Sequence, residues 1–361
     1  ALSSAASDVY KRQVVVESDN VTGQLEISDG MRSVESAAES RVFEAAQAIG
    51  GHPMDFFEKL LPYLLSGISV GGQYALIAVG YTMVYGILRL INFAHGDVFM
   101  VSGLMMVYAV TWMPLWLAIP FVIVFTVLLG FLIERAAYKP LRSAPRMSVM
   151  ISAIGVSYLL QNLALYVTGG LNKNYPTIPW ISDTVSIFGA TTKMVTLVTP
   201  VLTLVLVVLL VLLINHTKIG MAMRAVAKDF ETSTLMGIKI NNVISMTFII
   251  GSFLAAIGSM LFFTNYPGVT PTVGAMPGLK AFVAAVFGGI GSIPGAVIGA
   301  FIIGICENII KGLDTLLVAY GVIPTGLGLS TFADAFTFVL LIIILVFKPT
   351  GLFGEKATDK V

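Results

Sequence analysis

Charged residues are scarce in this sequence of 361 residues: Lys, Arg, Asp and Glu together make up 11%, against roughly a quarter in an ordinary soluble domain. Apolar residues make up 57% and gather in runs that approach the ~20 residues a helix needs to cross a bilayer. The runs are continuously apolar rather than alternating, which excludes the strands of a membrane barrel. The sequence therefore predicts an all-α fold, a polytopic inner-membrane helical bundle with about eight or nine apolar segments, some broken or re-entrant.

Cysteine is almost absent as well, since Cys306 is the single one and lies within an apolar run. A lone thiol excludes a disulfide framework and a Cys-based metal site. The patterns H-E-x-x-H and G-x-x-x-x-G-K-[ST] are both missing, which excludes a zincin metal site and a P-loop. The sequence has no basic patch interleaved with aromatic residues, and its net charge is only +1. We therefore expect no cofactor, no metal and no nucleic acid partner.

One segment, 67–71 (GISVG), matches the G-x-S-x-G nucleophile pattern of serine hydrolases. Such a serine needs a proton acceptor, but His52 lies in the polar N-terminal region and His216 follows an apolar run. Gly67 and Gly71 are four residues apart, a spacing that lets helices in lipid pack closely. We interpret Ser69 as part of that packing and expect no catalytic residue.

The apolar segments lie at about 60–90, 98–112, 115–133, 148–168, 196–214, 243–263, 279–290, 294–310 and 332–347. Three connections are rich in Lys and Arg and are predicted to face the cytoplasm. They carry Arg135, Lys139, Arg142 and Arg146; Lys218, Arg224, Lys228 and Lys239; and Lys348, Lys356 and Lys360. The connections 169–195, 264–278 and 312–331 hold only Lys173 and Lys193 between them, so they are predicted to face outward, with Lys311 as an exception.

Two stretches leave the number of crossings open. The stretch 279–311 must have both ends outside, so it forms either two spans that turn at 288–295 or a re-entrant pair of short helices. Near the front, two ordinary spans turning at 92–97 would place the N-terminus outside. A break at 92–97 inside the membrane would keep the polar N-terminal region inside, and we favour that arrangement.

The domain organisation follows from composition. Residues 1–55 form a polar N-terminal tail, and 1–13 (ALSSAASDVYKRQ) resemble translated adapter sequence, a suspected artefact. Residues 56–353 are expected to form a transmembrane domain that includes the segment 217–242, and 354–361 a cytoplasmic C-terminal tail.

A charged island at 217–242 separates two long apolar runs. Residues 221–236 contain no Pro or Gly and place Arg224, Lys228 and Glu231 on a polar stripe, which predicts one short amphipathic helix closed by Gly237. Asp229 adds a further charge. Such a helix either lies at the lipid headgroups or docks a cytoplasmic partner.

Polar residues also gather between apolar runs, at Asn92, His95, Gly96 and Asp97. Non-helical backbone at membrane depth is tolerated where it is buried in protein or lines a wet cavity, which makes these residues candidates for a translocation path. The alternative is an interfacial loop with Asp97 as a helix cap. Gly288, Gly289 and Gly291 form a second path candidate. Gly291, Gly295 and Gly299 recur every four residues, a spacing that favours close helix packing in lipid, and we favour that interpretation.

Other charges are expected near the interfaces. We place Glu307 at the interface next to Lys311, although a pore position is the alternative, and we expect Lys280 to extend outward. Glu134 and Arg135 are expected to form an interfacial ion pair.

Three stretches closely resemble the first permease subunit of bacterial branched-chain amino-acid ABC importers: 72–86 (GQYALIAVGYTMVYG), 91–97 (INFAHGD) and 278–299 (GLKAFVAAVFGGIGSIPGAVIG). The resemblance runs from about 56 to 353, and the block 287–295 is its most specific part. Urea permeases of the same architecture usually differ around that block, so they rank second. A secondary transporter that uses Asp97 and Glu307 as ion sites is the alternative from another class.

This resemblance implies an importer with two permease subunits and two cytoplasmic ATP-binding subunits, fed by a periplasmic substrate-binding protein. It implies that 217–242 is the segment that contacts the ATPase, with Glu231 six residues before Gly237 as in a degenerate form of that contact. The absent P-loop is then expected, because a separate subunit hydrolyses ATP. The implied location is the bacterial inner membrane, with several crossings of the lipid bilayer.

Overall fold

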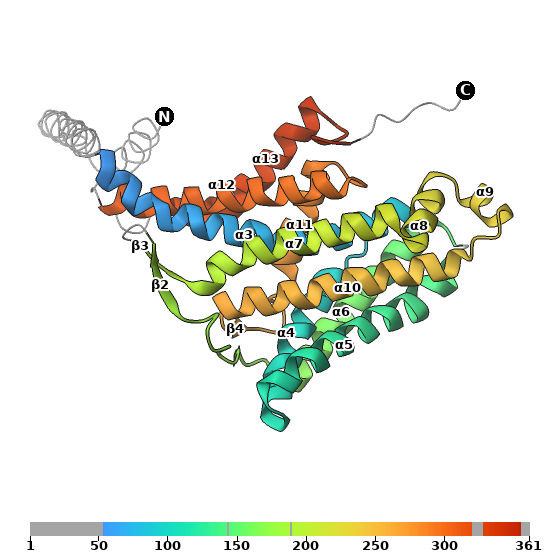
Figure 1. Ribbon diagram of the computed structural model, residues 1–361, viewed down its shortest axis with the longest axis horizontal. Helices are drawn as coiled ribbons and strands as arrows, with labels where there is room; N and C mark the ends of the chain where they lie inside the picture. Colours follow the sequence, from blue (N-terminus) through green and yellow to red (C-terminus); the bar gives the residue numbers. More distant parts are fainter. Residues whose placement is uncertain (1–52, 143, 188–189, 320–327, 355–361) are drawn as a thin grey trace, which may run out of the picture.

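The computed structural model describes residues 53–142, 144–187, 190–319 and 328–354, and element labels follow Figure 1. Nearly all of the polar tail predicted at 1–55, including 1–13, and of the tail at 354–361 lies outside these residues. The α-helices are α3 (Pro53–Leu88), α4 (His95–Trp112), α5 (Leu115–Ile133), α6 (Arg146–Thr168), α7 (Met194–His216), α8 (Lys218–Lys228), α9 (Phe230–Leu235), α10 (Ile240–Asn265), α11 (Ala275–Gly288), α12 (Ile293–Ala319) and α13 (Ala333–Phe347).

Short elements complete the chain. A π-helical turn, η1 (Glu134–Tyr138), and two 3-10 turns, η2 (Lys139–Leu141) and η3 (Leu329–Phe332), extend or precede longer helices. Two small antiparallel pairs join β1 (Lys173–Asn174) with β4 (Gly268–Val269) and β2 (Thr184–Ile187) with β3 (Ala190–Lys193). Within the described residues, seven helical stretches are long and apolar enough to cross a membrane, and α4 and α11 add shorter apolar helices. The predicted helical membrane bundle is confirmed.

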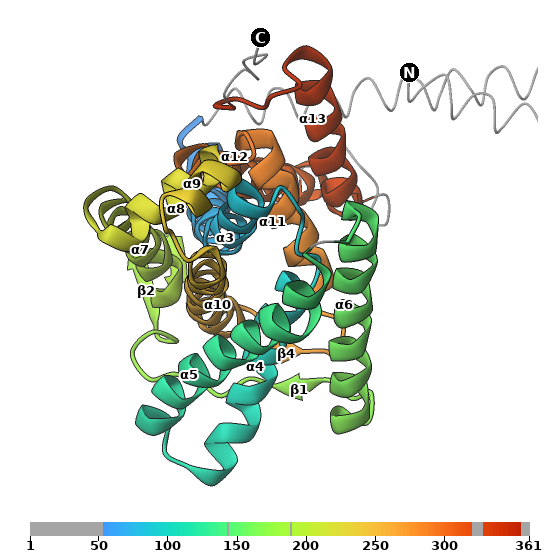
Figure 2. The same ribbon diagram turned by 90° about the vertical axis from the view of Figure 1, so that its right-hand side faces the viewer.

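Helix α3 is the centre of the bundle, and residues 69–84 are all buried. It packs against α7, α10, α11 and α12, which surround it in Figure 2. Its contact with α12 depends on glycine: a Cβ on Gly304 would lie 2.3 Å from the backbone N of Gly71, and one on Gly67 would lie 2.9 Å from the Cα of Ile305. Such close approach of two backbones maximises dispersion contact where lipid gives no hydrophobic gain, so the packing interpretation of these glycines is confirmed.

The described residues of the three basic connections lie toward one end of the bundle, which we call the α8 end (right in Figure 1). Arg142 donates to Asn241 in the first turn of α10, and Arg89 donates to the carbonyl of Ala227 in α8 (3.4 Å). The segment after α13 also returns there, because the amide of Leu352 donates to the carbonyl of Phe287 (2.9 Å). The opposite end holds the β-pairs, so the two groups of connections separate as the charge count predicted.

The favoured arrangement at the front of the chain is wrong about the side on which the first helix begins, although the segment 92–97 does lie inside the bundle. Helix α3 begins at the end opposite α8, beside β3, and Tyr63 in its first part lies against Gly312 of α12. It ends at Leu88 at the α8 end, and α4 then runs back toward the β-pairs. Two helices therefore turn at 89–94, and the first described residue lies on the side away from the basic connections. The chain reverses its direction within the six residues that separate α3 from α4. Hydropathy alone does not distinguish such a reversal from an interruption of a helix that continues in the same direction.

The stretch 279–311 forms two helices that turn between Gly288 and Ile293 at the α8 end. Helix α11 has only 14 residues, about 21 Å at 1.5 Å per residue, whereas the hydrocarbon core is about 30 Å thick. It begins beside the first turn of α4, since a Cβ on Gly274 would lie 2.2 Å from the carbonyl oxygen of Gly96. Both α4 and α11 therefore start inside the bundle.

Candidate functional site

The first turn of α4 is buried against α3. His95 is 3% exposed, and its ring lies edge-on to Tyr81 with centroids 5.1 Å apart. Gly80 makes room for it, because a Cβ there would lie 2.2 Å from Nε2 of His95. That nitrogen is buried and has no hydrogen-bond partner among the described residues. The imidazole of His95 thus packs against Gly80 and keeps one ring nitrogen that makes no hydrogen bond within the described residues.

Asp97 does not act as a helix cap. The N-cap of α4 is Ala94, which makes no side-chain capping bond. The carboxylate of Asp97 is 2% exposed and accepts hydrogen bonds from the hydroxyl of Ser157 and the amide of Gln161 (3.0 Å), both on α6. The capping alternative is therefore wrong, and Asp97 connects the start of α4 to the outer helix α6.

Asn92 and Gly96 fix the two sides of the same turn. The side-chain oxygen of Asn92, 3% exposed, accepts a hydrogen bond from the hydroxyl of Tyr138 in η1 (2.8 Å). A Cβ on Gly96 would lie 2.7 Å from the carbonyl oxygen of Gly274 and 3.0 Å from the Cα of Gly278. The turn therefore contacts α11 directly, and only a glycine fits at this crossing.

The glycines at 288–291 lie at the other end of α11. Gly289 and Gly291 have φ of +108° and +99°, a region that disfavours side chains. A Cβ on Gly288 would lie 1.9 Å from the carbonyl oxygen of Gly295, and one on Gly289 would lie 2.4 Å from the backbone N of Gly354. These glycines allow the sharp turn into α12 and the contact with the segment after α13.

The predicted path residues thus form two clusters, one at each end of α11, rather than one site. Between them the helix packs aromatic side chains, with Phe282 6.0 Å from Tyr81 and 6.4 Å from Phe93 between ring centroids. The void beside Phe282 and Tyr85 has a volume of about 10 Å³, hardly enough for one water. No amino acid fits there in this conformation.

The charged island forms two helices, so the prediction of one helix over 221–236 is wrong. Asp229 has an extended backbone (φ −149°, ψ 114°) and caps α9, accepting from the amides of Glu231 (3.0 Å) and Thr232 (3.1 Å). The amphipathic pattern continues from α8 into α9, so it does not reveal that the helix is interrupted at Asp229. The signal in the sequence for a new helix start was Asp229 itself, because Asp is a favoured N-cap residue. Gly237 (φ +82°) follows α9, as predicted.

The side chains of this segment are available at the α8 end. Arg224, Lys228 and Glu231 are exposed, and Arg224 donates to the side-chain oxygen of Asn215 (3.2 Å). The apolar face of α8 is anchored by Met223 and Val226, which are 4% and 2% exposed. The segment therefore has one face fixed to the bundle and one face free of it, as a docking element requires.

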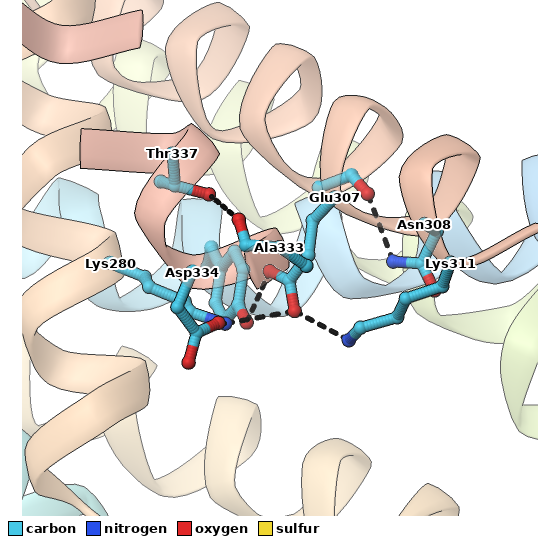
Figure 3. A network of polar contacts seen from close by, with 9 residues as sticks. Lys280, Glu307, Asn308, Lys311, Ala333, Asp334 and Thr337 are labelled. Atoms are coloured by element: carbon cyan, nitrogen blue, oxygen red, sulfur yellow. Dashed lines mark hydrogen bonds and ion pairs between the residues drawn. The ribbon is translucent and has the colours of Figure 1, made fainter. Parts of the chain in front are cut away.

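Figure 3 shows a buried ionic network that the sequence did not predict. Glu307 (α12) is 3% exposed and accepts from Lys280 of α11 (2.8 Å), Lys311 (2.6 Å) and the hydroxyl of Tyr74 in α3 (3.1 Å). Lys280 also pairs with Asp334 at the start of α13 (2.6 Å). Two cations, two carboxylates and the Tyr74 hydroxyl thus join four helices.

Two expectations about charges are therefore wrong. Glu307 is 3% exposed and pairs with Lys311 as expected, but Lys280, 6% exposed, points to Glu307 and Asp334 rather than outward. Glu134 is fully buried and pairs with Arg142, while Arg135 is exposed. In each case the true partner is on another element or beyond a turn. The signal available in the sequence was an unpaired charge within an apolar run, which at membrane depth implies a partner.

A cleft of about 470 Å³ opens at the α8 end, between the end of α3, the 138–149 region and the α8–α9 junction. It is lined by Ile87, Leu88, Arg89, Leu90, Tyr138, Arg142, Ala144, Arg146, Val149, Val226, Ala227, Lys228 and Phe230. Because Tyr138 also binds Asn92, the wall of the cleft touches the turn before α4.

Comparisons with known proteins agree on one family. A family model described as a branched-chain amino acid transport system permease component matches residues 63–346. The chain is 38% identical over 314 residues to the high-affinity branched-chain amino acid transport system permease protein BraD of Pseudomonas aeruginosa, covering 83% of this chain and 98% of BraD. It is 39% identical over 319 residues to the corresponding protein LivH of Escherichia coli strain K12, covering 84% and 99%.

Among solved structures, an inward-facing putative metal-chelate type ABC transporter matches 78% of this chain and 85% of its own, at 16% identity. The TM-score is 0.41, a level of similarity that supports no argument about this chain.

Proposed function

This chain belongs to the family of branched-chain amino acid transport system permease components, and from that premise we propose that it forms the translocation path of an ATP-driven importer for branched-chain amino acids. The observation that carries the proposal is the match, over nearly their whole length, to relatives named as permease proteins of high-affinity branched-chain amino acid transport systems. The protein itself catalyses no reaction; a partner hydrolyses ATP.

The proposed assembly contains a second permease subunit, cytoplasmic ATP-binding subunits and a periplasmic substrate-binding protein, in the bacterial inner membrane. The α8 end is the cytoplasmic end in this proposal, because the basic connections gather there. The C-terminal tail then begins on the same side, and 56–353 is the membrane domain.

The α8–α9 segment is the proposed contact with the ATPase, through Arg224, Lys228, Asp229, Glu231 and Gly237. Its geometry supports the role. The buried face of α8 transmits displacement to α3 and α7, against which it packs. The Asp229 cap and the positive φ of Gly237 hold α9 at a defined angle to α8 and α10.

The proposed path follows α11. Nucleotide-driven movement of α8 would re-pack the helices around Asn92, His95, Gly96 and Asp97 at one end of α11 and around Gly288, Gly289 and Gly291 at the other. The tight void beside Phe282 is then the closed position of the path. The backbone ends of α4 and α11 inside the bundle can meet the carboxylate and ammonium of a zwitterion without fixed charges. Most of the selectivity then belongs to the binding protein.

Replacing Glu231 with Arg tests the coupling role. The charge reversal should lower leucine uptake by the complete importer about tenfold, equivalent to ~1.4 kcal/mol of lost coupling, while ATP hydrolysis continues. Uptake and ATPase rates are measured on the same reconstituted complex. Glu231→Gln is the control, since it keeps the side-chain size and should have a smaller effect. Normal uptake by the Arg variant, at normal membrane insertion, counts against this contact.

A further inference from the structure

The cleft at the α8 end has a strongly positive lining. Arg89, Arg142, Arg146 and Lys228 come from the end of α3, the 134–145 region, the first residue of α6 and the last residue of α8. Four cations from separate elements thus converge on one cavity of about 470 Å³, within the range of about 300–1,000 Å³ typical of small-molecule sites.

Little in the protein neutralises this charge. Arg142 pairs with Glu134, but Arg89, Arg146 and Lys228 form no ion pair within the described residues. The nearest carboxylate in sequence, Asp229, is engaged as the cap of α9. Arg89 makes one weak bond, to the carbonyl of Ala227 (3.4 Å), and is exposed, as are Arg146 and Lys228. Three of the four cations that line the cleft therefore have no ion pair within the described residues.

The rest of the lining is apolar, and an apolar surface continues from it. Leu88, Val149 and Phe230 form part of the wall. Helix α6, which begins at Arg146, lies at the edge of the molecule in Figure 2. One face of it exposes Met147 (66%), Ile151 (64%) and Tyr158 (62%) at helical spacing. A ligand held at Arg146 can thus extend along this face.

We propose that this cleft binds the phosphate-bearing headgroup of an anionic phospholipid, with the acyl chains along the exposed face of α6. Basic pockets between membrane helices on the cytoplasmic side suit such headgroups, and guanidinium groups bind phosphate oxygens in pairs. A transported amino acid fits this cleft less well than a phosphate headgroup does. Its single carboxylate is accompanied by an ammonium group, which the cations of the cleft repel.

The headgroup would bridge the moving parts of the proposed importer. Arg89 directly follows α3, Arg146 is the first residue of α6, and Lys228 belongs to the α8–α9 junction. A phosphate that binds all three stabilises one position of α8 relative to α3 and α6. Bound lipid would thus favour one conformation of the coupling segment. The size of the shift equals the difference in the lipid's binding free energy between the two conformations.

The experiment is native mass spectrometry of the full chain in detergent, titrated with phosphatidylglycerol or with phosphatidylcholine of the same acyl chains. Arg89→Gln/Arg146→Gln should weaken phosphatidylglycerol binding roughly 30-fold, about five-fold for each cation removed. Arg146→Gln alone is a second variant, because the side chain of Arg146 has no hydrogen bond or ion pair within the described residues, so its loss should not disturb folding. Lys218→Gln/Lys239→Gln removes the same charge at the same end, outside the cleft, and should bind as the unmodified chain does.

Selective phosphatidylglycerol binding that the cleft variants lose and the control keeps would support the site. Equal phosphatidylglycerol binding by the cleft variants and the control would overturn it. So would displacement of the lipid by millimolar inorganic phosphate, since the ligand would then be a free anion. The measurement needs no ATPase, so its result does not depend on the proposed transport function.

Discussion

Replacing Lys280 with Met should destabilise the folded chain by about 3 kcal/mol, because Glu307 and Asp334 each lose a buried partner. Glu307 keeps Lys311, but Asp334 keeps no other ion pair within the described residues, and α13 loses its ion pair to α11. The measurement is the fraction of folded protein in detergent as temperature or denaturant increases. Membrane insertion should be unchanged, and α13 should separate from α11 more readily than in the unmodified protein.

The matched test is the double variant Lys280→Met/Glu307→Gln. Removing both charges leaves fewer uncompensated groups, so the double variant should lose less stability than the sum of the two single variants. Lys218→Met, at an exposed position, is the control for the substitution itself. Additive losses would show that Lys280 and Glu307 do not interact in the folded protein.

Replacing Gly304 with Val should separate α3 from α12. The new Cβ would lie 2.3 Å from the backbone N and 2.5 Å from the Cα of Gly71, and neither atom can move without shifting the helix. Overpacking of this kind costs about 3 kcal/mol at the upper end of its usual range, and we expect both folded protein and leucine uptake to fall sharply. Folded yield is measured by size-exclusion chromatography, and uptake in cells that depend on the importer.

Gly155→Val is the control for this prediction. Gly155 lies within α6, and a Cβ there would have no atom within 4 Å among the described residues. The same substitution should therefore leave yield and uptake close to those of the unmodified protein. Equal damage from both variants would mean that glycine flexibility, rather than the α3–α12 contact, explains the effect.

The sequence predicted the helices and their grouping well, because both depend on local properties. Apolar runs fix where helices cross, and clustered Lys and Arg fix which connections share an end. The glycine contacts of Gly67 and Gly304 also follow from small residues in apolar helices. The resemblance at 91–97 and 278–299 identified the family that the comparisons confirm.

What the sequence could not predict depends on tertiary contacts. Lys280 and Glu307 pair across 27 residues, and hydropathy gives no sign of it. The break at Asp229 was hidden by an amphipathic pattern that continues through it, and the reversal before α4 looks like a break to any count of apolar residues. The path residues were chosen for polarity in a membrane context, which could not show that α11 separates them into two clusters.

The most direct test of the account is leucine uptake into proteoliposomes, measured with this chain alone and with the second permease, the ATP-binding subunits and the binding protein added. The account predicts uptake only from the complete assembly with ATP, because the energy enters through a partner at α8 and α9. Uptake by this chain alone, driven by a proton gradient without ATP or binding protein, would contradict it and favour a secondary transporter.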